Sequence, residues 1–419
     1  MKPPIFYLVF FTLSSVVFAG EKVIRVIPRN ADDVEFLAGL PSDQDLELDF
    51  WKAPQRPGLA VDIQAGEHAY KILSVKLKER GLQFQITIMD VEKLMDEENL
   101  VASTRGIGVS FYSQYHTLDE ITQELYNLAN QHRDMTRVFS VGRSYEGREQ
   151  LAIELKGAPS FNKKTFFMNC GIHAREWVSP ASCMFIIKQI VSKYGKDSSV
   201  TEMLDKMDFI IMPVLNVDGY VFTWNKRSRR NRFWRKTRKP NWGSRCIGTD
   251  PNRNWNYKWG FPGASSDPCD DAFRGSHAFS EVEVRNVATF LGSLSEEGRI
   301  AGYMDVHAYS QLWMTPWGYT RQPTRDHREL MRVSKKAVEA IRKAGYGTSY
   351  RYGPSSVIIY QNSGGSKDYT YGVLKIKYSF ALELRDQGRY GFLLPANQII
   401  PTAMETFEGI KAMAKEMKL

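Results

Sequence analysis

The sequence predicts an α/β protein built from two folded units, and three observations support this. The chain has 419 residues, which is too long for one small domain and long enough to bury a sizeable core. Residues 22–90 carry short, compactly alternating strand and helix patterns. From Thr117 onward, longer strand-like runs alternate with amphipathic helices, which indicates one α/β domain of about 300 residues.

The first unit shows the patterns of four strands and two helices. Apolar positions recur at helical spacing in 67–80, and Gly81 ends that helix. In chain order, we expect a strand at 22–27, a helix at 32–40, strands at 48–51 and 59–63, a helix at 67–80 and a strand at 82–89. This β-α-β-β-α-β order is that of a small ferredoxin-like α+β domain. An acidic helix is expected next, at 91–99.

The second unit opens with a helix start signal. Thr117 followed three residues later by Glu120 is a capping box. Strands are expected at 137–141, 151–155, 165–169 and 207–215, and helices at 180–194, 281–294, 327–344 and 398–417. Glu281 and Glu283, on one of these helices, are expected to face solvent.

The amino terminus predicts export from the cell. Lys2 precedes an apolar stretch at 5–18, and Val17-Phe18-Ala19 forms a small-residue cleavage site, so residues 1–19 are interpreted as a signal peptide. The apolar run is too short for a membrane anchor, and no second span follows. We therefore expect a secreted, extracellular protein without a membrane span.

Four cysteines in such a chain favour two disulfides. Three connectivities are open from sequence. The local bridges Cys170–Cys183 and Cys246–Cys269 are favoured because both pairs lie close along the chain.

Charge is distributed unevenly along the chain. Residues 1–105 contain 12 basic and 16 acidic residues, although the whole chain carries a net charge of +9. Such asymmetry favours either a polyanionic partner or two parts of one chain that attract each other. Nine basic residues lie in 226–239, with Phe233 and Trp234 among them. We interpret this segment as a solvated basic face; a glycosaminoglycan partner is the alternative, and nucleic acid is not expected.

A candidate metal site is suggested by His173 and Glu176, three residues apart after an apolar strand. An imidazole and a carboxylate at this spacing can converge on Zn²⁺, although a surface ion pair is the alternative. His307, at the end of the apolar stretch 302–306, is the candidate third ligand because strand ends line the sites of α/β sheets. The remaining histidines are interpreted as structural: His68, His116, His132, His277 and His327.

Five longer motifs extend this pattern. They are HAREW at 173–177, NRFWRKTR at 231–238, DPNRNW at 250–255, YQNSGGS at 360–366 and ELRD at 383–386. In sequence and order they resemble the zinc metallocarboxypeptidases of the A/B type, and the first unit resembles the activation segment of that family. The resemblance covers nearly the whole chain. It implies a mixed parallel/antiparallel central sheet flanked by helices, preceded by a small α+β prodomain.

The resemblance also implies roles for individual residues. One Zn²⁺ would be bound by His173, Glu176 and His307, the His₂Glu set of catalytic zinc sites. Asp250 would not bind the zinc itself but would contact the His173 ring and fix its tautomer. Glu383 would act as general base on the zinc-bound water during hydrolysis of the C-terminal peptide bond.

Further roles concern the substrate. Arg235 would stabilise the oxyanion, and Asn252 with Arg253 would bind the C-terminal carboxylate of the peptide or protein. The other implied substrate-binding residues are Arg175, Tyr309, Tyr360 and Phe392. The three implied zinc ligands and the implied general base are all present: His173, Glu176, His307 and Glu383. Their presence argues against a catalytically silent relative. The sequence contains no G-x-S-x-G motif, so a serine hydrolase is not expected.

One position departs from the family pattern. The residue at the floor of the pocket for the last side chain is aliphatic in members that remove apolar residues and acidic in those that remove Lys or Arg; here it is Lys367. A buried ammonium would repel a basic side chain and attract a carboxylate. This predicts a preference for C-terminal Glu or Asp, as in the acid-specific carboxypeptidase O-like branch. The alternative is that Lys367 leaves the pocket or pairs with a neighbour, which would leave an apolar preference.

The family resemblance also predicts a zymogen. Arg105, in a weakly patterned segment, is a plausible cleavage site for a trypsin-like protease. The expected parts are a signal peptide at 1–19, an activation domain at 20–105 and a catalytic domain at 106–419, and the enzyme is expected to be a monomer.

Overall fold

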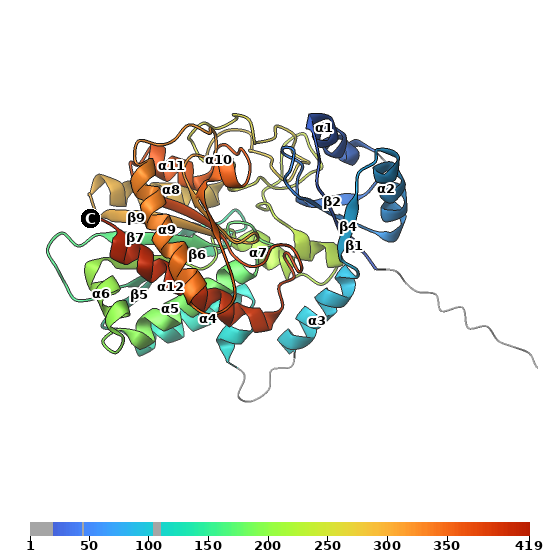
Figure 1. The fold of residues 1–419 in the computed structure, drawn as a ribbon. Helices are drawn as coiled ribbons and strands as arrows, with labels where there is room; N and C mark the ends of the chain where they lie inside the picture. Colours follow the sequence, from blue (N-terminus) through green and yellow to red (C-terminus); the bar gives the residue numbers. More distant parts are fainter. Residues whose placement is uncertain (1–19, 44–45, 104–109) are drawn as a thin grey trace, which may run out of the picture.

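The computed structural model describes residues 20–43, 46–103 and 110–419. The expected signal peptide and the expected cleavage site at Arg105 lie outside the described residues. Two sheets organise the chain, a small one near the amino terminus and a large one that forms the body of the molecule (Figure 1). The long helix α3 (Val91–Ser103) follows the small sheet.

The small sheet has four antiparallel strands in the order β2-β3-β1-β4. Its strands are β1 (Lys22–Val26), β2 (Leu48–Lys52), β3 (Val61–Ala65) and β4 (Phe84–Ile88). Leu37 of α1 (Ala31–Gly39) and Leu73 of α2 (Glu67–Glu79) share one buried apolar cluster with Ile24 and Ile63. The expected β-α-β-β-α-β order is confirmed, with boundaries that differ by at most two residues.

The large sheet has eight strands in the order β11-β10-β12-β9-β7-β8-β6-β5. The inner strands β12, β9, β7 and β8 are parallel, whereas β10 and β6 run antiparallel to their inner neighbours. The sheet is therefore mixed, as the family resemblance implied. Its strands are β5 (Thr136–Arg143), β6 (Glu149–Leu155), β7 (Thr165–Cys170), β8 (Asp208–Met212), β9 (Ile300–His307), β10 (Leu312–Thr315), β11 (Arg351–Pro354) and β12 (Tyr378–Glu383).

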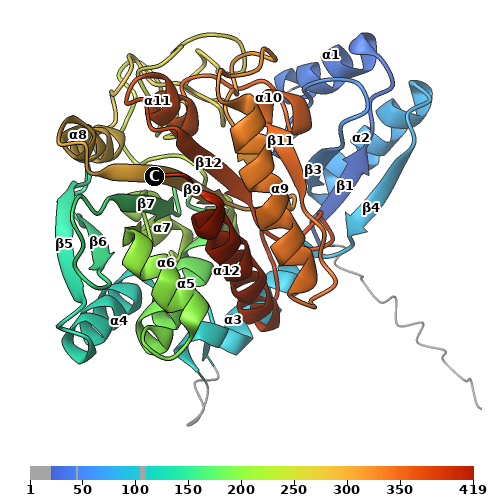
Figure 2. The same cartoon turned by 60° about the vertical axis from the view of Figure 1, so that its left-hand side comes forward.

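Helices cover both faces of this sheet (Figure 2). Alternate residues of one strand point to opposite faces, so Phe166 and Met168 belong to one apolar cluster and Phe167 to another. On the first face pack α4 (Leu118–Gln131), α5 (Val178–Lys193), α6 (Ser198–Lys206), α9 (His327–Lys343) and α12 (Ile399–Glu416). On the second pack α8 (Val282–Glu296) and α11 (Ser366–Gly372). Shorter helices are α7 (Val217–Thr223) and α10 (Ser355–Ile358).

The expected capping box and the expected disulfide pairing are confirmed by these elements. Thr117 and Glu120 form the reciprocal capping box of α4. Both local disulfides are present: Cys170–Cys183 ties the end of β7 to α5, and Cys246–Cys269 closes a long loop. Within the described ranges, no helix is long and apolar enough to cross a membrane.

The expectation that Glu281 and Glu283 face solvent is wrong. Both are buried, with 2% and 0% of their surface exposed. Glu281 accepts hydrogen bonds from the hydroxyls of Thr237 and Ser280, and Glu283 accepts one from the backbone N–H of Tyr145. The start of α8 is covered by loops that lie far away in the sequence, which helical periodicity cannot reveal.

Candidate active site

The site lies where the inner parallel strands end. His307 is the last residue of β9, Glu383 is the last residue of β12, and these two are register partners. His173 follows β7, the neighbour of β9 on its other side. Because the carboxyl ends of parallel strands meet at one edge of a sheet, three segments separated by up to 210 residues converge here.

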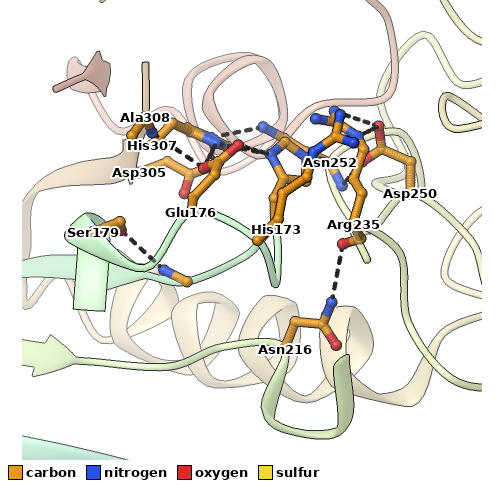
Figure 3. A network of polar contacts seen from close by, with 12 residues as sticks. His173, Glu176, Ser179, Asn216, Arg235, Asp250, Asn252, Asp305, His307 and Ala308 are labelled. Atoms are coloured by element: carbon orange, nitrogen blue, oxygen red, sulfur yellow. Dashed lines mark hydrogen bonds and ion pairs between the residues drawn. The ribbon is translucent and has the colours of Figure 1, made fainter. Parts of the chain in front are cut away.

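Three side chains form a compact ligand set (Figure 3). One ligand atom each from His173, Glu176 and His307 lies within 4.8 Å of the others, and all three residues are buried. His173 Nδ1 lies 2.7 Å from Glu176 Oε1, and His307 Nδ1 lies 3.2 Å from Glu176 Oε2. The two Nδ1 atoms face each other at 3.1 Å. Two imidazole nitrogens and a carboxylate pointing at one position suit Zn²⁺.

Both imidazoles are backed by a carboxylate on the opposite ring edge. His173 Nε2 lies 3.1 Å from Asp250 Oδ1, as expected from sequence. His307 Nε2 lies 2.9 Å from Asp305 Oδ2, a contact that was not expected. The stretch 302–306, which is otherwise apolar, contains this carboxylate. Since residues two apart on a strand share a face, Asp305 at i−2 of His307 was the available signal.

The electrostatics of the centre favour a cation. Burial opposes ionisation of Glu176, but the two imidazoles hold the pKa of its carboxyl below the ordinary value. Burial also favours neutral His307, but Asp305 and Glu176 raise the pKa of that imidazole well above its ordinary value. Glu383 differs: burial, reinforced by the negative charge of Glu176, raises its pKa to about 8, although His307 opposes the shift.

A second group of polar side chains lies beside the ligand set. Arg235 donates to Asp250 Oδ2 through Nη2 at 2.7 Å. Asn252 Nδ2 lies 3.0 Å from His307 Nε2, and its Oδ1 accepts the backbone N–H of Ser366. The buried guanidinium of Arg253 donates to the carbonyls of Gly263 and Asn252 and lies 6.0 Å from the ring centre of Tyr360. The expected oxyanion and carboxylate-binding residues thus gather at one side of the centre.

Three further expected substrate residues are covered by the N-terminal unit. The guanidinium of Arg175 lies over the Phe392 ring at 4.4 Å and contacts Asp49 of β2 at 3.4 Å. Trp51 of the same strand packs on Phe392, with ring centres 5.2 Å apart. The hydroxyl of Tyr309 donates to Asp62 of β3 at 2.7 Å. The small sheet therefore occupies the approach to the site.

Lys367 is buried in the first turn of α11, next to Ser366 and hence close to Asn252. Its Nζ lies 2.6 Å from Asp368 Oδ1. Asp368 also accepts the backbone N–H groups of Gly318 and Tyr319. The ammonium thus stays inside the protein and has an acidic neighbour.

Comparisons with known proteins agree with this geometry. A family model described as "Zinc carboxypeptidase" matches residues 121–409, and one described as "Carboxypeptidase activation peptide" matches residues 24–98. The chain belongs to the zinc carboxypeptidase family. As a member with an activation peptide, this zinc carboxypeptidase is a zymogen of a metallo-exopeptidase that uses one Zn²⁺.

Individual relatives of this zinc carboxypeptidase are similar over nearly their whole length. Carboxypeptidase A2 of Rattus norvegicus is 42% identical over 405 residues, covering 96% of this chain and 94% of the relative. Carboxypeptidase A1 of Bos taurus is 42% identical over 398 residues, covering 94% and 93%. The crystal structure of thrombin activatable fibrinolysis inhibitor superposes with a TM-score of 0.87 at 33% identity, covering 96% of this chain and 99% of that one. Carboxypeptidase A from Helicoverpa armigera gives 0.83 at 25% identity, covering 96% and 98%.

The basic segment of this carboxypeptidase forms the solvated face expected from sequence only in part, because Lys226, Arg227, Arg229 and Arg230 are exposed and the rest is partly or fully buried. Arg232 is buried and donates to Glu98 at 2.7 and 2.9 Å. Arg230 pairs with Glu47, and Arg229 lies 3.4 Å from Asp96. Each of these acids belongs to the N-terminal region. The attraction between two oppositely charged parts of one chain, one of the two alternatives drawn from the charge distribution, is present in the structure.

Proposed function

We propose that His173, Glu176 and His307 hold the zinc of this carboxypeptidase, and that Glu383 is its general base. The observation that carries the proposal is the convergence of three ligand atoms within 4.8 Å at the strand ends. The donor set fits the ion, because both inward Nδ1 atoms are free to present lone pairs while both outward Nε2 atoms face carboxylates. When bound, zinc would supply Lewis acidity toward the peptide carbonyl and acidify an attacking water.

The chain's own groups then complete the hydrolysis. Glu383 takes a proton from the attacking water and passes it to the leaving amine. Burial and the negative charge of Glu176 raise the pKa of Glu383, which makes its carboxylate a stronger base toward the proton of the water. Arg235, held by Asp250, provides positive charge for the oxyanion that develops on the carbonyl.

Removal of only the last residue requires a binding site for its free carboxylate. We assign this role to Asn252 and Arg253, with Tyr360 beside them. The Arg253 guanidinium is held by two backbone carbonyls and can present its remaining N–H groups to a carboxylate in a fixed orientation. Arg175, Tyr309 and Phe392 form the approach used by the preceding residues of the peptide.

We propose further that the enzyme prefers C-terminal Glu or Asp. Lys367 is 5% exposed, and its Nζ has three N–H donors but one hydrogen-bond partner within the described part of the chain, Asp368. The backbone N–H groups of Gly318 and Tyr319 already satisfy much of the Asp368 carboxylate. A substrate carboxylate would supply the acceptors that the buried ammonium lacks.

A second specificity is favoured by the same ion pair. If Asp368 neutralises Lys367, the pocket presents no net charge to the last side chain of the substrate. Such a pocket would accept apolar side chains, and the A-type names of the relatives agree with that specificity.

Three peptides that differ only in their last residue, Glu, Phe or Lys, distinguish these proposals. The protein is treated briefly with trypsin, and release is measured with and without a zinc chelator. Chelator-sensitive release of Glu supports both the zinc mechanism and the acidic pocket. Release of Phe in preference to Glu keeps the mechanism and contradicts the acidic pocket. If none of the three residues is released, the proposed activity is wrong.

We propose that residues 20–105 form the activation domain and residues 106–419 the enzyme, separated by a trypsin-like cut near Arg105. The small sheet would inhibit by covering Arg175, Tyr309 and Phe392. Two disulfides and the amino-terminal pattern support a secreted, extracellular protein, and we expect it to be a monomer. Mass analysis after limited trypsin treatment locates the cut, and size-exclusion chromatography tests the monomer.

The basic segment supports a glycosaminoglycan proposal that depends on activation. Arg229 and Arg230 are more than half exposed yet paired with acids of the N-terminal region. Loss of that region would free both guanidinium groups beside Lys226 and Arg227 for a sulfated polyanion. We therefore expect the activated enzyme to be retained more strongly than the precursor on heparin near physiological salt. Equal elution of the two forms contradicts the proposal.

A further inference from the structure

The contact between His307 and Asp305 has a structural cause. The two residues lie two apart on β9, so their side chains emerge on the same face of the sheet. His307 Nε2 lies 2.9 Å from Asp305 Oδ2, and Asp305 has no exposed surface. The Asp305 carboxylate therefore belongs to the buried interior of the site and not to the protein surface.

Two elements lock this carboxylate in place. Asn169, its register partner on β7, donates from Nδ2 to Asp305 Oδ1 at 2.7 Å. Ser366, at the start of α11, donates its hydroxyl to Asp305 Oδ2 at 2.6 Å. Asn169 and Ser366 are themselves buried, with 0% and 1% exposed. Asp305 thus joins β7, β9 and α11 at a point behind the ligand set.

The role of Asp305 depends on which ring nitrogen of His307 carries the proton. If Nδ1 presents its lone pair to zinc, the neutral imidazole must carry its proton on Nε2. Among the residues that the structure describes, Asp305 Oδ2 and, at 3.0 Å, Asn252 Nδ2 contact Nε2. The amide nitrogen is a donor and cannot accept this proton, whereas the carboxylate can.

We infer that Asp305 is a positioning residue, which selects the metal-binding tautomer of His307 and leaves the Asn252 amide free for the substrate carboxylate. The inference rests on the proposed zinc site. It gives His307 the same support that Asp250 gives His173, and it places a fixed carboxylate behind each imidazole. Partners of this kind typically strengthen metal binding by about 10–100-fold.

The hydrogen bonds around Asp305 extend to α11, the helix that contains Lys367. Ser366 holds Asp305 through its hydroxyl and Asn252 through its backbone N–H. Lys367 is the next residue. A change at Asp305 should therefore affect zinc affinity first and substrate KM second, because an unprotonated His307 Nε2 could then accept a hydrogen bond from the Asn252 amide.

The test compares zinc affinity by chelator competition in the full-length protein, with no activity measurement required. Asp305→Asn is expected to weaken zinc binding by about 10–100-fold, while the zinc-free protein keeps its circular dichroism spectrum. After trypsin activation of the variant, excess zinc should restore kcat but leave KM raised. Unchanged zinc affinity in Asp305→Asn overturns the inference.

A second pair of variants separates the network from general packing. Ser366→Ala removes the hydroxyl that holds Asp305, and Ser379→Ala removes a buried serine hydroxyl that bonds instead to Ile376 and Thr370. Zinc should bind more weakly to Ser366→Ala than to Ser379→Ala; equal affinities contradict the role of the Ser366 contact. If the unaltered protein binds no zinc at all, the proposed zinc site itself fails, a result distinct from equal binding by the variants.

Discussion

The hydroxyl of Tyr309 donates a 2.7 Å hydrogen bond to Asp62, and this bond joins the small sheet to the approach of the active site. Asp62 is 1% exposed and also accepts from Arg25 at 2.6 and 2.7 Å. Next to it, Lys52 lies 4.3 Å from the ring centre of Tyr309. Burial lowers the pKa of Lys52, although the negative charges of Asp62 and Glu383 oppose that shift. Charged groups of the small sheet thus lie against Tyr309, one of the residues proposed to line the approach for the substrate.

Asp62→Ala should raise the activity of the uncut precursor. The substitution leaves Arg25 and Tyr309 without their shared acceptor, and breaking a buried charged contact of this kind costs about 3–5 kcal/mol. Peptide release by the purified precursor measures the effect. Glu35→Ala, at an exposed acid of the same domain, is the control, and after complete removal of the activation domain all forms should have equal kcat. Precursor activity as low as that of Glu35→Ala would contradict the covering role of Asp62.

Glu383→Gln should reduce kcat by about 10²–10⁴-fold, because the amide cannot take a proton from the attacking water. The side chain is not in the ligand set, so zinc content should stay near one per chain. Single-turnover peptide cleavage and metal analysis of the same sample check both statements. A variant that loses zinc together with activity would assign Glu383 to metal binding instead.

Lys367→Ile should lower the Glu-to-Phe preference by at least about tenfold, which corresponds to about 1.4 kcal/mol. The substitution removes the ammonium and leaves an aliphatic side chain at this buried position. The ratio of kcat/KM values for the two peptides is the measurement. Lys335→Ile, at an exposed position of α9, controls for loss of positive charge alone. An unchanged ratio rejects the proposed pocket.

Glu283→Gln should stabilise the protein above pH 7. Burial, reinforced by the charges of Glu281 and Asp218, raises the pKa of Glu283 to about 7. A raised carboxyl pKa means that the folded state binds the proton more tightly, so stability falls as pH rises from about 4.5 to 7, by up to ~3 kcal/mol. Gln stays neutral and removes this loss. Urea unfolding between pH 5 and 8 should show a flatter profile for Glu283→Gln than for Glu296→Gln, an exposed site on the same helix; parallel profiles contradict the prediction.

Glu405→Ala should destabilise the catalytic domain by about 3–5 kcal/mol, because it leaves a buried guanidinium unpaired. Glu405 is fully buried and accepts from Arg385 Nε at 2.9 Å and from the hydroxyls of Thr348 and Tyr350. The double variant Arg385→Met with Glu405→Leu should recover much of this loss, as measured by thermal unfolding. If the double variant is no more stable than Glu405→Ala, the lost stability does not come from the unpaired charge.

Local sequence patterns were sufficient for most elements and for the residues of the centre. The capping box at Thr117, the strand-like run of β7 and the helical spacing of 67–80 depend on residues that are near neighbours in the sequence. The motif at 173–176 and the strand end at 307 could be recognised for the same reason. By contrast, the local pattern predicts that Glu283 faces solvent. The loop at Tyr145 that covers it lies 138 residues away in the sequence.

The amino-acid sequence by itself determined the family, the two-part organisation and the chemical identity of the ligand set, since residue types and their spacing record these directly. Tertiary structure alone decided which groups meet across large sequence separations. It brought the Nδ1 atoms of His173 and His307 within 3.1 Å of each other and set Asp62 against Tyr309, 247 residues further along. The physical reason is that burial and charge pairing act through distance in space. Strand order and helix packing set that distance, and no local pattern encodes it.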